Sequence, residues 1–291
     1  MQTGIDSYSY HRLFGDVRVG ETPSAVSWPT DHHRALEHAT ICGAEWLFLE
    51  TCFLTAPTID AFAVDVSGSG PRIGFSWGHG WPKGQSHGLH GGRRADAPSQ
   101  MHAWIDAATR LGHPLLRVTA GSPDTRGAEP VAPLLARLAP VLRRAAVRAW
   151  DAGVVLALEN HGDLRARDVL ELLERTDHPG LGVCLDNVNL IRVGDDMIEG
   201  TRLLGEAVRI VQLKDCAPGD PAIRGGPAST VLGEGSLDLD RVIAVLGQAG
   251  FNGPVCVELA TLGETHEDEL AMVERSIAWL RKHLPPSQAS S

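Results

Sequence analysis

Eight short apolar runs, separated by longer stretches of helical periodicity, constrain the fold of this chain more than any other feature. The runs cover residues 3–8, 44–50, 71–77, 114–119, 154–159, 181–186, 209–214 and 254–258. Runs that are short and apolar throughout are typical of strands buried on both faces, as in a parallel sheet. The helical stretches between and after them cover residues 31–43, 99–112, 130–153, 167–176, 197–208, 239–250 and 266–284.

This unbroken alternation of strand and helix favours a single-domain (β/α)8 TIM barrel over a doubly wound sheet. A dinucleotide-binding sheet would carry a glycine-rich phosphate loop after its first strand, and GIDSYSYHRLFG at 4–15 is not one. We therefore expect a barrel over residues 1–285 and a disordered tail at 286–291. Two long glycine-rich loops, 78–98 after the third strand and 216–236 after the seventh, should lie on the face where such barrels carry their chemistry.

Charge and cysteine content narrow the class of partner. The formal net charge of −10 argues against nucleic acid, because phosphate binding needs an excess of Lys and Arg. The five cysteines include no CxxC pair and suggest neither a disulfide framework nor a zinc ribbon. No signal peptide and no membrane-length apolar run is recognisable. We expect a cytoplasmic protein with a small-molecule substrate, and we leave homo-oligomerisation open.

Carboxylates end three of the last four expected strands. Glu159, Asp186 and Glu258 close the fifth, sixth and eighth, and Gln212 lies near the end of the seventh. Buried acids that converge at one barrel mouth repel each other and are costly unless they are paired or ligate a metal. A divalent cation removes that cost, and oxygen ligands favour hard ions such as Mn²⁺ or Mg²⁺. The plainer interpretation, that strands end in polar residues where they reach the surface, explains one such acid better than three.

Five short motifs together resemble a known superfamily. They are ENH at 159–161, D-x-x-N at 186–189, Q-x-K-D at 212–215, GEG-x-x-D at 233–238, and the glutamate that ends the last strand. The combination is similar to the xylose isomerase-like superfamily of sugar phosphate isomerases and epimerases. That group also includes inosose and dehydroshikimate dehydratases and divergent AP endonucleases. The resemblance runs from GIDSYSY to VCVEL and is strongest over 155–258.

The resemblance implies four metal ligands: Glu159, Asp186, Gln212 and Glu258. Two positions depart from the family pattern, because Gln212 stands where the third ligand is usually His and Asn189 where a substrate-binding His is common. An amide in place of imidazole gives an all-oxygen site, which shifts the preference from Zn²⁺ toward Mn²⁺ or Mg²⁺.

The family's chemistry implies a divalent-metal-dependent isomerase or epimerase of a small sugar or keto-polyol. Glu159 and Glu258 would then be the catalytic acid/base pair, which removes and returns a proton next to a carbonyl through a metal-stabilised enediolate. The alternative is a lyase on the same scaffold, either a dehydratase or an enzyme that cleaves 3-keto-glycosides. An endonuclease is disfavoured by the net charge, and a non-catalytic subunit by the retained acids.

Asn189, at the position of the family's histidine, is a candidate for binding substrate, and so are four further residues. His79, His161 and Lys214 follow or end expected strands, and Trp77 could form an apolar wall over a sugar ring. Each has a plainer interpretation: a loop histidine, a histidine that satisfies the next loop, an ion pair of Lys214 with a neighbouring acid such as Asp215, and ordinary rim packing. Arg117, inside the fourth strand, is expected to pair with Glu50 or Glu159.

Overall fold

The computed structural model of the chain describes residues 1–18, 20–28, 31–54, 70–80, 88–217, 229–262 and 267–285. The expected tail at 286–291 lies outside the described residues, as do parts of both glycine-rich loops.

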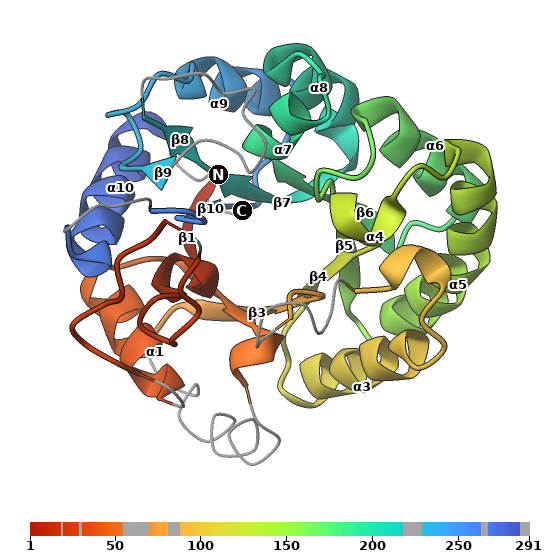
Figure 1. Ribbon diagram of the computed structural model, residues 1–291, viewed down its shortest axis with the longest axis horizontal. Coiled ribbons are helices and arrows are strands. Elements are labelled where there is room, and N and C mark those ends of the chain that lie inside the picture. Colours follow the sequence, from red (N-terminus) through yellow and green to blue (C-terminus); the bar gives the residue numbers. More distant parts are fainter. Residues whose placement is uncertain are drawn as a thin grey trace, which may run out of the picture.

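Eight parallel strands close into a barrel, in the order β1-β10-β7-β6-β5-β4-β3-β2 (Figure 1). They are β1 (Gln2–Asp6), β2 (Trp46–Glu50), β3 (Arg72–Trp77), β4 (Leu115–Thr119), β5 (Val155–Glu159), β6 (Leu181–Asp186), β7 (Val208–Leu213) and β10 (Pro254–Val257). Each overlaps one apolar run of the sequence, so the expectation of a (β/α)8 barrel is confirmed. Two short strands, β8 (Asp215–Cys216) and β9 (Ser229–Thr230), pair antiparallel outside the barrel.

Helices surround the barrel (Figure 1). They are α1 (His32–Ile41), α3 (Ala97–Arg110), α4 (Pro123–Arg126), α5 (Val131–Asp151), α6 (Ala166–Thr176), α7 (Asn187–Arg192), α8 (Met197–Leu204), α9 (Leu239–Gln248) and α10 (Glu269–His283). Short 3-10 turns cover Ser7–Tyr10, Thr51–Phe53, His90–Gly92 and Gly205–Ala207. None of the helices in the described ranges is long and apolar enough to cross a membrane.

The alternation of side chains along each strand produces two separate apolar layers. The larger one lies between strands and helices and includes Val211 and Leu213 of β7. The smaller one fills the barrel interior with Trp46, Phe48, Ala157, Cys184, Ile210 and Cys256. The last inward-facing residues of the strands are polar. The apolar residues of the barrel interior therefore form the floor beneath the polar barrel mouth.

Asp215, just after β7, organises the loop that leads into α9. Its Oδ2 accepts hydrogen bonds from the backbone N–H groups of Gly233 and Gly235, both at 3.0 Å, and its Oδ1 accepts one from Leu237 at 3.2 Å. A Cβ atom on Gly235 would lie 2.1 Å from Oδ1, so the close approach requires glycine. The GEG segment therefore wraps around a buried carboxylate, and Asp238 caps α9 by accepting a hydrogen bond from Arg241 N–H.

Replacing Asp215 by Asn should lower the free energy of unfolding by about 2–4 kcal/mol, because buried N–H groups lose a charged acceptor and meet an amide N–H. Urea denaturation measures this. Asp106→Asn is the matched control: Asp106 is 57% exposed in its ion pair with Arg148, and it should cost less than about 1 kcal/mol. Equal losses in the two variants would contradict the structural role assigned to Asp215.

Candidate functional site

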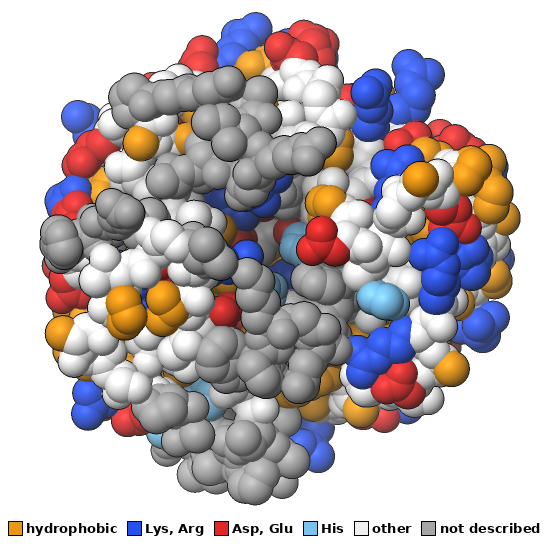
Figure 2. Space-filling view, viewed as in Figure 1, with side chains coloured by type: hydrophobic (Ala, Val, Ile, Leu, Met, Phe, Trp, Pro, Cys, Tyr) orange, Lys and Arg blue, Asp and Glu red, His pale blue; other side chains and the backbone are white. Residues whose placement is uncertain are grey.

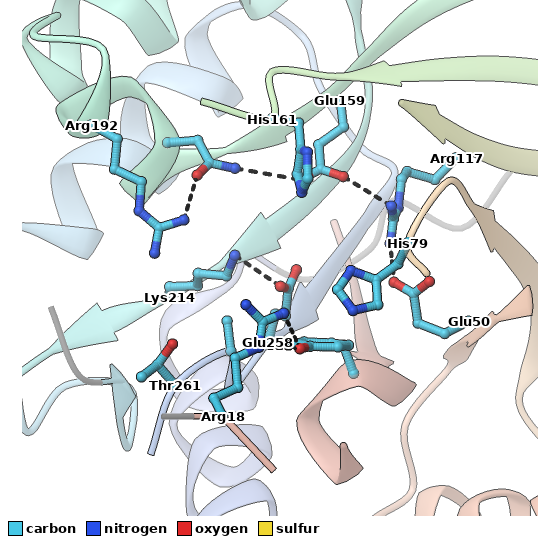
Figure 3. A pocket seen from close by; sticks show the side chains of 13 residues that line it. Arg18, Glu50, His79, Arg117, Glu159, His161, Arg192, Lys214, Glu258 and Thr261 are labelled. Carbon is cyan, nitrogen blue, oxygen red and sulfur yellow. Dashed lines mark hydrogen bonds and ion pairs between the residues drawn. The ribbon is translucent and has the colours of Figure 1, made fainter. Parts of the chain in front are cut away.

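A polar pocket lies at the mouth of the barrel, where the strands end and their side chains converge (Figure 3). The space-filling view shows a hollow at the centre of this face, with basic, acidic and histidine side chains visible inside it (Figure 2). The lining residues are Tyr8, Arg18, Glu50, His79, Arg117, Glu159, His161, Asn189, Arg192, Lys214, Glu258, Ala260 and Thr261. Six of the nine residues expected from the sequence to form the site therefore line one pocket.

Two asparagines fix the backbone of the functional strand ends. Asn160, directly after Glu159, accepts a hydrogen bond from Asp186 N–H at 2.8 Å and donates one to Asp186 C=O at 2.9 Å. Asn187 does the same to Lys214, accepting from its N–H and donating to its C=O, both at 2.9 Å. Each clamp ties the residue after one strand to the end of the next, so the side chains of Asp186 and Lys214 project from rigid positions.

Buried negative charge exceeds buried positive charge around this pocket. The five carboxylates are Asp6, Glu50, Glu159, Asp186 and Glu258, each at most 6% exposed. The two buried cations among them are Arg117 and Lys214, at 3% and 4%. If all the carboxylates ionise, three negative charges are left without a buried counter-charge. Such an arrangement is unstable unless protons or a cation compensate it.

Arg117 of β4 holds two of these carboxylates. Its Nη2 donates to Glu50 Oε1, and its Nη1 lies 3.0 Å from Glu159 Oε2. The expected pairing of Arg117 is thus confirmed with both partners (Figure 3). The second contact is an ion pair without hydrogen-bond geometry, since Glu159 Oε2 has no hydrogen-bond partner.

Burial raises the pKa of both glutamates expected to move protons. The pKa of Glu159 is raised to about 7 by burial, against the opposing effect of Arg117, and Asp186 raises it further. The pKa of Glu258 is also raised to about 7 by burial, against the effect of Lys214. Carboxyl groups with pKa values near neutrality exchange protons efficiently at physiological pH.

These pKa values predict how stability of the metal-free protein depends on pH. Glu258 has a pKa of about 7 when folded against an ordinary value of 4.5. Its contribution to stability is therefore fully present below pH 4.5 and is lost as the pH rises through 7. Glu258→Gln lacks this group, so its unfolding free energy minus that of wild type should grow from pH 5 to pH 8. Thermal or urea unfolding in EDTA measures the difference.

Wild type and Glu258→Gln must be compared because the buried histidines change the unfolding free energy with pH in the opposite direction. Burial lowers the pKa of His79 and of His161 to about 4, so both favour folding as the pH rises toward their ordinary value of 6.5. Their contribution is common to wild type and variant and cancels in the difference. A pH-independent difference would contradict the raised pKa of Glu258.

The two histidines line the pocket in neutral form. His161 Nδ1 lies 2.8 Å from Gly121 C=O, which can only accept, so Nδ1 carries the proton and Nε2 is an acceptor. His79 Nε2 lies 3.4 Å from Asp16 Oδ2, which likewise places its proton on Nε2. His161 is thereby suited to accept a hydrogen bond from a substrate hydroxyl.

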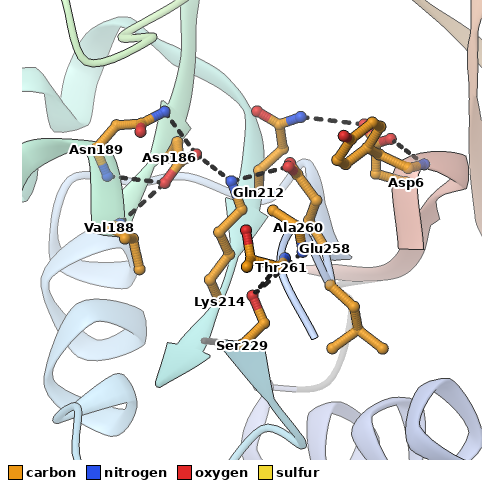
Figure 4. A network of polar contacts seen from close by, with 12 residues as sticks. Asp6, Asp186, Val188, Asn189, Gln212, Lys214, Ser229, Glu258, Ala260 and Thr261 are labelled. Atoms are coloured by element: carbon orange, nitrogen blue, oxygen red, sulfur yellow. Dashed lines mark hydrogen bonds and ion pairs between the residues drawn. The ribbon is translucent and has the colours of Figure 1, made fainter. Parts of the chain in front are cut away.

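The four expected metal ligands lie close together but are engaged with other partners. Asp186 Oδ2 is 2.5 Å from Lys214 Nζ, and Glu258 Oε1 is 2.8 Å from the same ammonium (Figure 4). Gln212 donates from Nε2 to Asp6 Oδ2 at 3.1 Å and accepts from the Cys184 thiol. Within the described parts of the chain, no three His, Cys, Asp or Glu side chains are arranged to hold a metal ion. Metal ligation by these residues stays a prediction.

One expectation from the sequence needs correction. Trp77 is 3% exposed and packs in the layer between strands and helices, so it does not line the pocket. It shares a face of β3 with Phe75, whereas the inward position is Ser76, which donates to Asp6. The plainer interpretation of Lys214, an ion pair with Asp215 or a neighbouring acid, agrees with the structure, in which the ammonium contacts Asp186 and Glu258.

The first two strands also end in acids. Asp6 ends β1 and Glu50 ends β2, so both follow the same rule of an acid at a strand end. Tyr8 and Arg18 follow β1 and reach the pocket from the loop beyond it. Arg18 Nε donates a hydrogen bond to Tyr8 Oη at 2.5 Å. The periodicity of the sequence does not predict that these two residues meet.

Known proteins resemble the chain in sequence and in fold. A family model described as the xylose isomerase-like TIM barrel matches residues 74–283. A ketose 3-epimerase of Arthrobacter globiformis is 29% identical over 220 residues, which cover 69% of this chain and 71% of the epimerase.

Three solved structures share the fold at low sequence identity. An L-ribulose 3-epimerase has a TM-score of 0.74 at 17% identity, covering 97% of this chain and 94% of that one. The IOLI protein with a bound zinc atom has a TM-score of 0.71 at 13% identity, covering 99% and 100%. AsbF of Bacillus anthracis, a probable 3-DHS dehydratase, has a TM-score of 0.67 at 14% identity, covering 97% of this chain. Because the family model matches well over half of its residues, this chain belongs to the xylose isomerase-like TIM-barrel family.

Proposed function

We propose that the chain is a divalent-metal-dependent epimerase or isomerase of a small sugar or keto-polyol. The observation that carries this proposal is the pair Glu159 and Glu258, which line one pocket with pKa values near neutrality. The similarity to a ketose 3-epimerase over most of the chain supports the substrate class. Together they favour transfer of a proton at a carbon next to a carbonyl group.

The donor set fits a divalent ion once Lys214 moves aside. Glu159 Oε2 and Glu258 Oε2 are buried oxygens without a hydrogen-bond partner. The buried carboxylates exceed the buried cations by three, and a divalent cation would offset two of these three negative charges. Glu159, Asp186, Gln212 and Glu258 would hold it, and their oxygen donors favour Mn²⁺ or Mg²⁺. When bound, the ion would stabilise negative charge that develops on the substrate's carbonyl oxygen.

The chain's own residues divide the proton transfer between two carboxylates. In our proposal one of Glu159 and Glu258 removes the proton from the carbon, and the other delivers a proton to the opposite face or to the neighbouring carbon. They extend from β5 and from the residue after β10, on different sides of the pocket (Figure 3). A pair on two sides of a substrate is what inversion at carbon requires.

Other lining residues would orient the sugar. His161 Nε2 would accept a hydrogen bond from a hydroxyl group. Asn189 donates to Asp186 Oδ2 at 2.7 Å and accepts from Arg192 at 2.9 Å, which fixes its amide at the pocket wall. Lys214 and His79 would contact substrate oxygens from the remaining sides. We propose these four as substrate-binding residues.

Incubating the Mn²⁺-supplemented protein with a panel of ketoses in D₂O tests this function. We expect an epimeric or isomeric product that carries one carbon-bound deuterium, detected by NMR and mass spectrometry. Loss of water or of an aglycone would instead establish the lyase alternative, which the fold similarity to a probable dehydratase and the unusual Gln212 and Asn189 keep in view. If no carbohydrate gives either deuterium incorporation or elimination, both the epimerase and the lyase assignments are contradicted.

A further inference from the structure

Lys214 carries its ammonium group into the centre of the carboxylate cluster. Its side chain is 4% exposed, and Nζ lies between Asp186 Oδ2 and Glu258 Oε1 (Figure 4). Asn187 holds the backbone N–H and C=O of Lys214, so the side chain extends into the cluster from a fixed point of the backbone. The two carboxylates compensate the charge of the ammonium where it is buried.

Two of the oxygens that contact this ammonium belong to expected metal ligands. A divalent ion binds carboxylate oxygen at roughly 2.0–2.2 Å. An ion at that distance from Asp186 Oδ2 and Glu258 Oε1 would occupy the space in which Nζ lies, 2.5 and 2.8 Å from the same atoms. Steric overlap and repulsion between like charges make the two cations mutually exclusive.

Asp186 has no spare oxygen with which to avoid this competition. Its Oδ1 accepts from Val188 N–H at 2.9 Å and Asn189 N–H at 3.0 Å, at the start of α7. Its Oδ2 accepts from Asn189 Nδ2 and from Lys214. A metal ion can gain Oδ2 only when the ammonium leaves it.

We propose that Lys214 is a built-in cation that holds the metal position in the metal-free protein and is displaced into the pocket when a divalent ion binds. The inference deepens the proposed function and depends on the metal site proposed there. Lys214 already lines the pocket, and its flexible four-carbon stem allows Nζ to turn toward substrate. The displaced ammonium would donate hydrogen bonds to substrate oxygens, so that metal loading also completes the substrate site.

Mn²⁺ affinity measured by calorimetry at pH 8, without substrate, tests the competition. Lys214→Met should bind Mn²⁺ at least about tenfold more tightly than wild type, because no ammonium has to be displaced. Lys282→Met is the matched control: Lys282 is exposed on α10, and its loss should leave affinity unchanged. Equal or weaker binding by Lys214→Met, or no binding by either protein, would overturn the proposal.

Chemical labelling of the wild-type protein tests the same proposal without depending on whether Lys214→Met folds. Acetylation by an amine reagent, quantified by mass spectrometry, should increase at Lys214 when Mn²⁺ is added and remain constant at Lys282. Labelling of Lys214 that does not respond to Mn²⁺ would overturn the proposal. Both measurements omit substrate, so a failure of the epimerase assignment, seen as absence of deuterated product from metal-loaded protein, is a separate result.

Discussion

Replacing Glu258 by Gln is expected to lower kcat about a thousandfold, and Glu159→Gln should have an effect of similar size. Gln keeps the shape and one oxygen donor of Glu but cannot accept or return a proton. Glu258 Oε2 is buried without a hydrogen-bond partner, which leaves that atom available to a substrate proton, and Glu159 Oε2 is in ion-pair contact with Arg117 at 3.0 Å. Steady-state kinetics at saturating Mn²⁺ measure the loss, and Mn²⁺ affinity of each variant separates it from loss of metal.

Glu50→Gln is the matched control for this experiment. Glu50 is a carboxylate of the same pocket, which also contacts Arg117 and also has a buried Oε2 without a hydrogen-bond partner, but it lies outside the proposed proton-transfer pair. We expect it to retain kcat within about tenfold of wild type. Equal losses from Glu50→Gln and Glu258→Gln would mean that general charge in the pocket matters, and would refute a specific acid/base pair.

Replacing Arg117 by Met should lower the free energy of unfolding at pH 8 by about 3–5 kcal/mol. Arg117 is the buried cation between Glu50 and Glu159, whose side chains are 1% and 3% exposed. Without it, two carboxylates remain buried without a counter-charge. The loss should be smaller at pH 5, where both can take up protons, since the pKa of Glu159 is already about 7 with Arg117 present. Urea denaturation at the two pH values measures the effect.

Arg148→Met provides the comparison at the surface. Arg148 forms an ion pair with Asp106 at 2.7 Å, but the two side chains are 48% and 57% exposed. Solvent screens such a pair, so its loss should cost less than about 1 kcal/mol. The double variant Arg117→Met/Glu50→Gln should recover part of the stability lost in Arg117→Met. If the two arginine variants were equally stable at pH 8, burial would not govern the energetics of this cluster.

The barrel was predictable from sequence because its signal is local and repeated. Each of the eight strands is a continuous apolar run, and Glu159, Asp186 and Glu258 stand at the ends of three of these runs. Strands of a closed parallel barrel end at one mouth, so a linear pattern was enough to bring distant acids together. The same rule, applied to β1, predicts Asp6 as well.

The features that the sequence could not predict depend on side-chain direction and burial rather than on the spacing of residues. The sequence predicts an ion pair of Lys214 with a nearby acid, but the choice of Asp186 and Glu258 as partners follows from the direction of its side chain after β7. The aromatic ring of Trp77 suggests a wall over a sugar, whereas the alternation of side chains along β3 turns it outward. The raised pKa values of Glu159 and Glu258 come from complete burial beside other acids, which only the packed structure reveals.

The most direct measurement of the central claim needs no knowledge of the substrate. It is a titration of the protein with Mn²⁺, in which the electron paramagnetic resonance signal of free Mn²⁺ reports binding. The proposed site predicts one Mn²⁺ bound per chain in wild type and none in Glu159→Gln/Asp186→Asn, which removes two of the three ligand charges. A wild-type protein that leaves all the Mn²⁺ free throughout the titration would contradict the assignment of these carboxylates to a metal site.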